Sequence, residues 1–280
     1  MSVSPVLASR AAETCRLAAD REYEFLKSPF LSPAEQVIFM KAAAEADGFT
    51  ARRLFFFGGC AGADRRRAVF VPSYMDTDSA PSYMEIFKSS REEFFKDLLC
   101  AMAPDENVGI VPVLVKGSGF VTLSHRHYMG SVLGLGLERD VIGDIAVTSD
   151  TTAVIFTDRR IAPFVCENLT SVGRDTVKCS PCEIASDFVI PRKFETLHIA
   201  AGSDRADSVA ASLSGVSRAE AKAMCICGNV EINYTSPIEP DARVSTCDIV
   251  SVRGHGKFII DSFDGTTRSG RLKLTVRRYL

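Results

Sequence analysis

The alternation of apolar and polar positions divides the chain into segments of different character. The pattern of residues 5–48 is typical of helices, and its clearest start signal lies at Ser32. Pro33 follows at once and Glu35 stands three positions after the serine, which combines a cap, a first-turn proline and a capping-box glutamate. Gly48 supplies a C-terminal stop. We therefore expect a helical N-terminal region.

From residue 53 onward the apolar positions group into shorter runs. Two runs flank a glycine-rich turn in residues 53–71 and predict a β-hairpin. Ser124 caps a helix whose apolar residues have core spacing. The other expected elements are a helix at 90–103, a strand at 109–117, a strand-turn-strand unit at 143–156, a helix at 158–173 and a strand from 174. Interleaved strands and helices predict one α+β or α/β sandwich domain.

The last part of the chain combines two short helices with several strands. Pro191 marks a boundary before it. The helices are expected at 204–213 and 217–227, with a tight turn between them. Strands are expected at 229–234, 248–253 and 256–262, followed by a final alternating segment from 271 to the end. We therefore divide the chain into three domains, residues 1–52, 53–190 and 191–280.

Composition places the protein among ordinary globular proteins. Of its 280 residues, 46% are hydrophobic and 24% charged, and no apolar run is long enough for a transmembrane helix. The N-terminus lacks a basic start followed by an apolar segment, so secretion is not expected. Nine cysteines without dense, even spacing favour reduced thiols in the cytoplasm.

Charge is distributed unevenly along the chain. The net charge is −2, but the part from Arg192 onward carries +3 and the preceding part −5. This asymmetry suits a C-terminal module that faces an anion.

Two cysteine pairs raise the question of metal or redox chemistry. Cys225 and Cys227 stand two positions apart, and an α-helix rotates the side chain by about 200° over that distance, so the sulfurs diverge. Cys225 is expected on the packed face with Cys227 pointing away. Cys179 and Cys182 have redox or zinc spacing but stand alone, so a structural role competes with a thiol or zinc site. We expect no metal and no cofactor.

Basic residues also form small clusters outside the C-terminal part. His125 and Arg126 lie at an expected helix N-terminus, where free N–H groups and cations favour phosphate, although plain surface solvation explains them equally well. Arg65 and Arg66 begin a basic triplet at a hairpin edge, where a solvated edge is the usual role and RNA contact the rarer one.

Basic positions in the C-terminal part recur on one side of each expected element. Arg218 and Lys222 are i, i+4 neighbours beside the core stripe of their helix, and Arg205 begins the preceding helix. In the strands, cations alternate with apolar residues at 253–257 and 271–277. This arrangement suits recognition of RNA by backbone and shape, with a merely soluble face as the competing interpretation. The candidate RNA-binding residues are Arg205, Ser217, Arg218, Lys222, Arg253, Lys257, Arg271 and Lys273, with Arg65, Arg66, His125 and Arg126 as a secondary set.

This C-terminal pattern resembles the S4-like RNA-binding domain, also called the αL motif. The usual outline is R-L-D, S-R-x-x-A-x-x-L-I, G-x-V-x-V-N-G and G-D-x-I, and residues 205–207 and 217–249 follow it. Three positions depart from it: Ala206 replaces leucine, and Tyr234 and Cys247 replace glycines. We expect these departures to weaken turn geometry and core packing, but not the basic positions.

Three earlier segments resemble the bacterial YlmH family. They are FFFGGCAGADRRRAVFVP, FVTLSHRHYMGSVLGLGLERDVIGDIAV and NLTSVGRDTV, and the similarity covers most of residues 25–280. His127 departs from the acidic residue usual in an H-R-D triplet, and residues 84–108 look like an insertion. The resemblance implies an α+β protein with a helical N-terminal segment, an RRM-like α/β sandwich in the middle and an S4-like domain at the C-terminus.

The resemblance also implies a function. It indicates a non-enzymatic, cytoplasmic RNA-binding protein that associates with the large ribosomal subunit during rescue of stalled translation. Its expected partner is ribosomal RNA, with tRNA contact left open, and the protein is expected to be a monomer that does not bind membranes. A link to cell division has also been attached to the family.

Two other classes of function remain open from sequence. S4-like domains are often joined to RNA-modifying enzymes of the pseudouridine synthase or methyltransferase type. The chain lacks an R-L-D catalytic loop with a flanking T-S-G and a glycine-rich methyl-donor motif after a strand. A thiol or zinc enzyme would rest on Cys179 and Cys182 alone.

Overall fold

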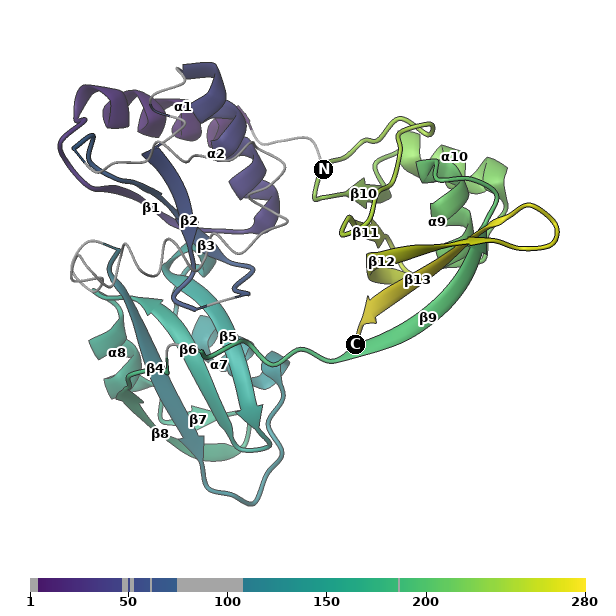
Figure 1. Cartoon of the computed structure of the whole chain (residues 1–280). Helices are drawn as coiled ribbons and strands as arrows, with labels where there is room; N and C mark the ends of the chain where they lie inside the picture. Colours follow the sequence, from purple (N-terminus) through teal and green to yellow (C-terminus); the bar gives the residue numbers. More distant parts are fainter. Residues whose placement is uncertain (1–4, 47–49, 51–52, 61, 75–107, 186) are drawn as a thin grey trace. The chain divides into compact units, whose positions relative to one another are not determined.

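The computed structural model describes residues 5–46, 50, 53–60, 62–74, 108–185 and 187–280. It consists of two compact units, one that extends to Pro191 and one formed by Arg192–Leu280 (Figure 1). Both units combine helices with antiparallel sheets, so the fold is α+β. No helix within the described ranges is long and apolar enough to cross a membrane. The helix expected at 90–103 lies outside these ranges.

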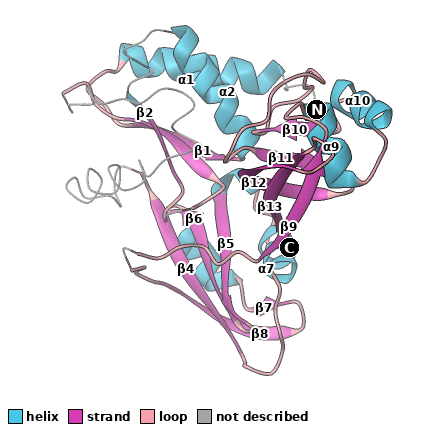
Figure 2. Ribbon diagram, turned by 45° about the vertical axis from the view of Figure 1, so that its right-hand side comes forward, coloured by secondary structure: helices cyan, strands magenta, loops and turns pink. Residues whose placement is uncertain are grey.

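The first unit begins with two helices and a three-stranded sheet. Its elements are α1 (Pro5–Asp20), β1 (Leu26–Leu31), α2 (Pro33–Ala46), β2 (Leu54–Phe57) and β3 (Arg66–Phe70). Helices α1 and α2 pack together (Figure 2), and antiparallel pairing of β2 with β3 confirms the expected hairpin. The predicted start of α2 is confirmed too, because the Ser32 N–H donates to Glu35 Oε2 at 2.6 Å.

The prediction that residues 5–48 are helical is wrong between α1 and α2. Strand β1 lies there and pairs with β3, which makes β3 the central strand of the order β1-β3-β2. Pro29 opposes a helix because it lacks an N–H, and it falls at the irregularity in the β1–β3 register, where a sheet tolerates proline. Phe30 and Leu31, at the end of β1, are buried.

A five-stranded antiparallel sheet and two helices complete this unit. The elements are β4 (Ile110–Gly117), α7 (His125–Gly134), a 3-10 turn (Arg139–Val141), β5 (Ile142–Ser149), β6 (Thr152–Asp158), α8 (Ala162–Asn168), β7 (Ser171–Val172) and β8 (Asp175–Pro181). The strand order is β5-β6-β4-β8-β7, and α7 and α8 cover one face (Figure 1). The helix expected over 158–173 is shorter than predicted, because the chain leaves it at Asn168 and enters β7.

The other face of this sheet is also buried. Phe156 of β6 is fully buried on it and packs with Phe30 of β1 and Phe55 of β2. Phe188, from the segment after β8, lies with its ring centroid 6.4 Å from that of Phe156. Gly59 approaches so closely that a Cβ there would lie 2.5 Å from the Phe156 ring. The small sheet and the larger one therefore share one hydrophobic core.

A buried ion pair joins the two sheets of this unit. Arg67 of β3 and Asp158 of β6 are hydrogen-bonded side chain to side chain, and Arg67 also donates to the Val108 carbonyl at 3.0 Å. Burial alone would raise the pKa of Asp158, but hydrogen bonds from Arg160 and Arg67 outweigh it and hold the pKa well below its usual range. Asp158 is therefore charged inside the protein at neutral pH.

The second unit packs two helices on one face of a sheet. Its elements are β9 (Phe194–Ala201), α9 (Ala206–Ser214), α10 (Arg218–Ile226), β10 (Val230–Ile232), β11 (Ile249–Val252), β12 (Gly256–Thr266) and β13 (Leu272–Tyr279). The strands lie in the order β10-β11-β12-β13-β9, all antiparallel. Both predicted helices and the predicted strands are confirmed, whereas β9 was not predicted from the sequence.

Removal of Arg67 should destabilise the first unit much more than removal of Arg160. Arg67→Met should lower the free energy of unfolding by about 3–5 kcal/mol, because Asp158 keeps a buried charge without its buried partner. In the control Arg160→Met, the lost side chain is 84% exposed, and such pairs contribute about 1 kcal/mol or less. Urea unfolding at pH 7 measures both, and equal losses would contradict the assignment.

The same pair predicts a pH dependence. The folded-state pKa of Asp158 is lowered, so its contribution to stability is present above the unfolded pKa of about 3.9 and is lost as the pH falls from there through the folded pKa. The stability difference between the wild type and Asp158→Asn should therefore shrink below about pH 4. A difference that stays constant from neutral to acid pH would show that Asp158 is not charged in the fold.

Candidate nucleic-acid interface

Two capped helices carry the main group of predicted RNA-binding residues. Arg205 is the N-cap residue of α9, and Gly215 ends this helix with a left-handed φ of 73° that glycine adopts without strain. Ser217 then caps α10, because its Oγ accepts the Glu220 N–H at 3.2 Å. Ser217 was predicted to bind RNA, and its hydroxyl serves the helix start. It therefore fixes where Arg218 emerges.

Arg205 and Arg218 converge on one buried carboxylate. Asp207, in the first turn of α9, is 3% exposed. Arg205 donates to it through Nε and Nη2, both at 3.2 Å, and Arg218 Nη2 donates at 3.3 Å. Burial alone would raise the pKa of Asp207, but hydrogen bonds from both arginines outweigh it and lower the pKa.

This arrangement leaves positive charge on the surface. Two guanidinium groups share a single carboxylate, so the cluster keeps a net charge of about +1 at neutral pH. The Arg205 and Arg218 side chains remain 37% and 57% exposed, and each guanidinium has more N–H donors than Asp207 uses. Lys222, one turn along α10 from Arg218, is exposed as well. Arg205 and Arg218, which Asp207 holds, can meet phosphate oxygens without first being ordered.

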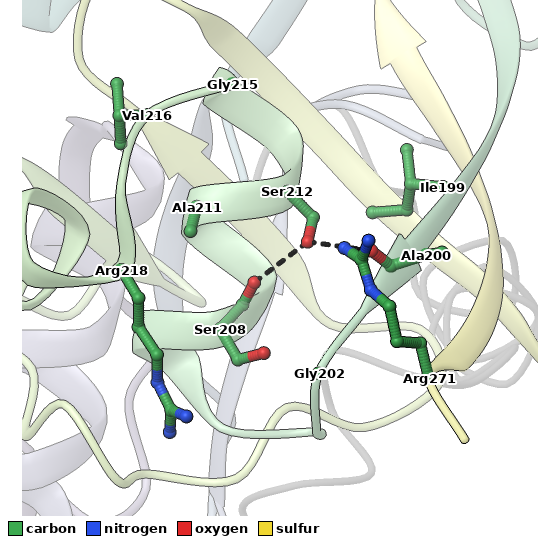
Figure 3. Close-up of a pocket in the computed structure, with 10 residues that line it drawn as sticks. All are labelled: Ile199, Ala200, Gly202, Ser208, Ala211, Ser212, Gly215, Val216, Arg218 and Arg271. Atoms are coloured by element: carbon green, nitrogen blue, oxygen red, sulfur yellow. Dashed lines mark hydrogen bonds between the residues drawn. The ribbon is translucent and has the colours of Figure 1, made fainter. Parts of the chain in front are cut away.

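A pocket adjoins this cluster. It has a volume of about 650 Å³ and lies between α9, the end of β9 and the start of β13. Figure 3 shows Arg218 on one side of it and Arg271 on the other. Arg271 donates to the Ala200 carbonyl, and Ser212 Oγ lies 3.1 Å from the same oxygen. The polar groups at the bottom of the pocket are thus already hydrogen-bonded within the protein, and two arginines lie at its rim.

The remaining predicted cations lie on a different surface. Lys273 and Lys257 lie on the sheet face opposite the helices, because the alternate residues of β12 and β13 form the core. Arg253 was predicted on the same strand face as Lys257, and this is wrong: it lies in the turn between β11 and β12. The structure therefore divides the predicted set between a helix side and an outer sheet side.

The two departures from glycine fall on left-handed residues. Tyr234 has a φ of 62° and Cys247 a φ of 68°, a conformation in which a side chain costs energy that glycine avoids. Asn233, at φ 49°, precedes Tyr234 and is braced by Asp248, whose Oδ1 accepts from Asn233 Nδ2 at 3.0 Å. Both turns therefore carry the conformational cost of a side chain in the left-handed region.

Arg65 and Arg66 form hydrogen bonds within the protein and do not lie on a solvated edge of a sheet. Arg65 donates to the carbonyls of Ile142, Phe30 and Arg139 at 2.8–3.0 Å, and desolvation lowers its pKa. Arg66 Nε donates to the Ala63 carbonyl at 2.6 Å. The expectation of a solvated hairpin edge is wrong, because β3 is the central strand of its sheet. The two side chains therefore hold neighbouring segments of the first unit together through backbone carbonyls.

The basic start of α7 is partly used for capping. His127 was noted as a departure from an H-R-D triplet, and its Nδ1 accepts the Ser124 N–H at 3.1 Å, the bond that an acidic side chain would accept at that position. Desolvation and the charge of Arg139 lower the pKa of His125, so its ring is neutral at pH 7 and a weak ligand for anions. Arg126 is exposed and can contact an anion.

The middle sheet differs from a base-stacking platform. RRM sheets bind RNA by stacking bases on aromatic residues of an open face. Here the face away from α7 and α8 is covered, and its aromatic residue Phe156 is fully buried. RNA contact by this part of the chain would have to use another surface.

The cysteines have the character of structural residues. Cys225 is buried and Cys227 exposed, which confirms the divergence expected from helical geometry. Burial raises the pKa of Cys179 to about 11, and its Sγ lies 3.2 Å from the Leu169 carbonyl. Burial also raises the pKa of Cys182. Both thiols are therefore protonated and unreactive at neutral pH.

Replacement of Asp207 should release both arginines. Asp207→Asn should destabilise α9 and α10 by about 1–2 kcal/mol, less than for a fully buried pair because the arginines can turn to water. Because the folded pKa of Asp207 is lowered, the loss should fade below about pH 4. Amide exchange of the two helices at neutral and acid pH measures this. Undiminished protection in the variant would contradict the anchoring role.

Glycine at the left-handed position should stabilise the second unit. Cys247→Gly should raise the free energy of unfolding by about 0.5–1 kcal/mol, because the φ of 68° is then unstrained. The matched control Cys227→Gly makes the same chemical change at a φ of −78° and should lower stability by about 0.5–1 kcal/mol. Thermal unfolding of the two variants tests the sign, and shifts in the same direction would contradict the strain argument.

Comparisons with known proteins bear on the whole chain. Residues 112–186 match a family model described as the putative RNA-binding domain in YlmH. The chain is similar to the ribosome-associated protein quality control protein P2 of Bacillus subtilis (strain 168), with 28% identity over 258 residues, which are 92% of this chain and 88% of that protein. The solved structure of cell division protein ylmH from Streptococcus pneumoniae aligns with a TM-score of 0.44 and 16% identity, over 65% of this chain and 94% of that one. The two sequence matches show that the chain is similar to proteins of the YlmH family.

Proposed function

We propose that this protein binds RNA on the ribosome and takes part in quality control of translation without catalysing a reaction. Its C-terminal unit acts as an S4-like RNA-binding domain. The observation that carries the proposal is the Arg205–Asp207–Arg218 cluster with Lys222 beside it. Cations held in place by a buried acid lose little conformational freedom when they meet a phosphate.

The ribosomal role extends what the relatives' names say. The Bacillus relative is called a ribosome-associated quality control protein, and the matched family model is described as a putative RNA-binding domain. We propose ribosomal RNA of the large subunit as the main ligand, with tRNA as a second contact, during rescue of stalled translation. The C-terminal unit carries a charge of +3, which favours such a polyanion.

The proposal that the chain is not an enzyme is supported by the chemistry of the pocket. None of the described residues that line it is a histidine, a cysteine or an acid. Ser208 Oγ accepts the Ser203 N–H at 3.0 Å, and Ser212 Oγ is engaged with backbone carbonyls. Neither hydroxyl has a general base beside it, which a nucleophilic serine needs.

Binding should therefore be sensitive to salt through named residues. For the purified chain and a ribosomal RNA fragment, the logarithm of affinity should fall linearly with that of salt concentration. Lys222→Ala should weaken binding and flatten the slope by about 0.7–0.9, the value of one phosphate contact. Arg218→Ala should act in the same way. Fluorescence anisotropy over a range of salt concentrations measures both.

Lys41→Ala is the matched control for charge. Lys41 is exposed on α2, outside the C-terminal unit, so its loss changes the net charge equally and should leave the slope unchanged. Salt-independent binding, or equal slopes in Lys222→Ala and the wild type, would contradict the proposed interface. Turnover of RNA on incubation, seen as an altered nucleotide by mass spectrometry, would contradict the non-enzymatic role.

A further inference from the structure

The outer face of the C-terminal sheet gathers aromatic rings that the core does not use. The unit contains five aromatic side chains, and two of them, Phe258 and Phe263, belong to the core beneath the helices. The other three are Phe194 of β9, Tyr234 after β10 and Tyr279 of β13. They are half-buried and lie outside that core. Core packing therefore does not explain why these three rings lie close together.

The three rings contact one another or a shared cation. The Phe194 and Tyr279 ring centroids are 4.9 Å apart, in an edge-to-face arrangement. Lys257 Nζ lies 4.6 Å from the Tyr279 centroid and 4.7 Å from the Tyr234 centroid, and it donates to the Tyr234 hydroxyl at 2.7 Å. Arg277 lies 5.0 Å from the Phe194 centroid. We call these five residues the aromatic cluster.

Strand register places the cluster on the face away from α9 and α10. Phe194 is paired with Tyr279 across β9 and β13, so the two side chains share a face. Val276 and Phe258 are core residues, and Arg277 and Lys257 are their neighbours in sequence, so they point to the opposite face. The helices therefore leave this surface open within the unit.

Tyr234 adds an independent observation. Its φ of 62° lies in the left-handed region, where a side chain costs energy. The tyrosine incurs this cost and places a ring and a hydroxyl against Lys257. A side chain kept in a strained conformation outside the core is a sign of function rather than of packing.

We infer that the aromatic cluster binds unpaired bases of single-stranded RNA. Aromatic rings and guanidinium planes stack on nucleobases of any sequence, and neighbouring ammonium groups hold the phosphates between them. Lys257 supplies a cation within the cluster, and Lys273 is exposed further along β13. The Arg277 guanidinium is ion-paired with Asp261, so it contributes a planar group beside Phe194 rather than an unpaired charge. An acidic peptide would use the cations but not the rings. Duplex RNA would offer no base faces, because its bases are stacked inside the helix.

The inference rests on the proposed function, that the C-terminal unit binds RNA, and assigns a second surface to it. The cations of α9 and α10 would hold phosphates, and the aromatic cluster would hold bases that have left a helix. An RNA that joins a duplex to an unpaired stretch would use both surfaces.

The chain contains no tryptophan, so one introduced tryptophan reports on the cluster. Tyr279→Trp keeps an aromatic ring in place, and a base that stacks on it should quench its fluorescence. We expect quenching by a short oligouridylate and not by a blunt RNA duplex. Phe120→Trp is the control, since Phe120 is 93% exposed in the loop between β4 and α7 and should not respond.

Affinity measurements on the intact chain complete the test. Phe194→Leu and Tyr279→Leu keep apolar volume but lose the ring, and each should weaken oligouridylate binding by roughly tenfold. Duplex affinity and its salt slope should stay unchanged, whereas Lys222→Ala should affect the slope. Tyr234→Phe keeps the ring and should retain stacking.

Distinct results would overturn the two proposals. If the wild-type chain binds the duplex with a salt slope that depends on Lys222, but the leucine variants bind oligouridylate normally, the stacking site is wrong and the proposed function stands. If the leucine variants lose both ligands equally, the rings are structural. Displacement of oligouridylate by a polyglutamate peptide from the wild type and from the leucine variants alike would assign the cluster to acidic protein partners, because such a peptide uses the cations and not the rings. No binding of either RNA would overturn both proposals.

Discussion

The C-terminal unit depends on one buried carboxylate. Asp207 accepts hydrogen bonds from Arg205, at the start of α9, and from Arg218, in α10. Its pKa is lowered, so it is charged in the folded protein near neutral pH. A lone buried acid would be costly, and two arginines without an acid between them would repel each other. The same contact thus stabilises the helix pair and orders the surface on which phosphate binding is proposed.

The sequence predicted those features that depend on residues close together in the chain. The local pattern predicted both C-terminal helices, with Ser217 as the start of the second, and helical geometry correctly separated Cys225 from Cys227. Exposure of Lys222 followed from the same geometry. The contact of Arg218 with Asp207 could not be predicted, because it spans eleven positions and depends on how the turn at Gly215 directs the second helix.

Misassignments arose where tertiary partners decide the outcome. β1 lies in a segment of helical pattern, and its pairing with β3 turned a supposed edge into a central strand. This pairing buries Arg67 and leaves Arg65 bonded to carbonyls. β9 escaped prediction because its residues are mostly half-buried or exposed, with weak alternation. Pro29 was a local signal that opposed a helix between α1 and α2.

The central proposal is that the cations of α9 and α10 attach this protein to large ribosomal subunits. Sedimentation in a sucrose gradient tests it most directly, with the wild type, the double variant Arg218→Ala, Lys222→Ala and the charge control Lys41→Ala. The account predicts that wild type and control sediment with free large subunits, while the double variant, still folded by circular dichroism, remains at the top. A double variant that sediments with the subunits as the wild type does would contradict it.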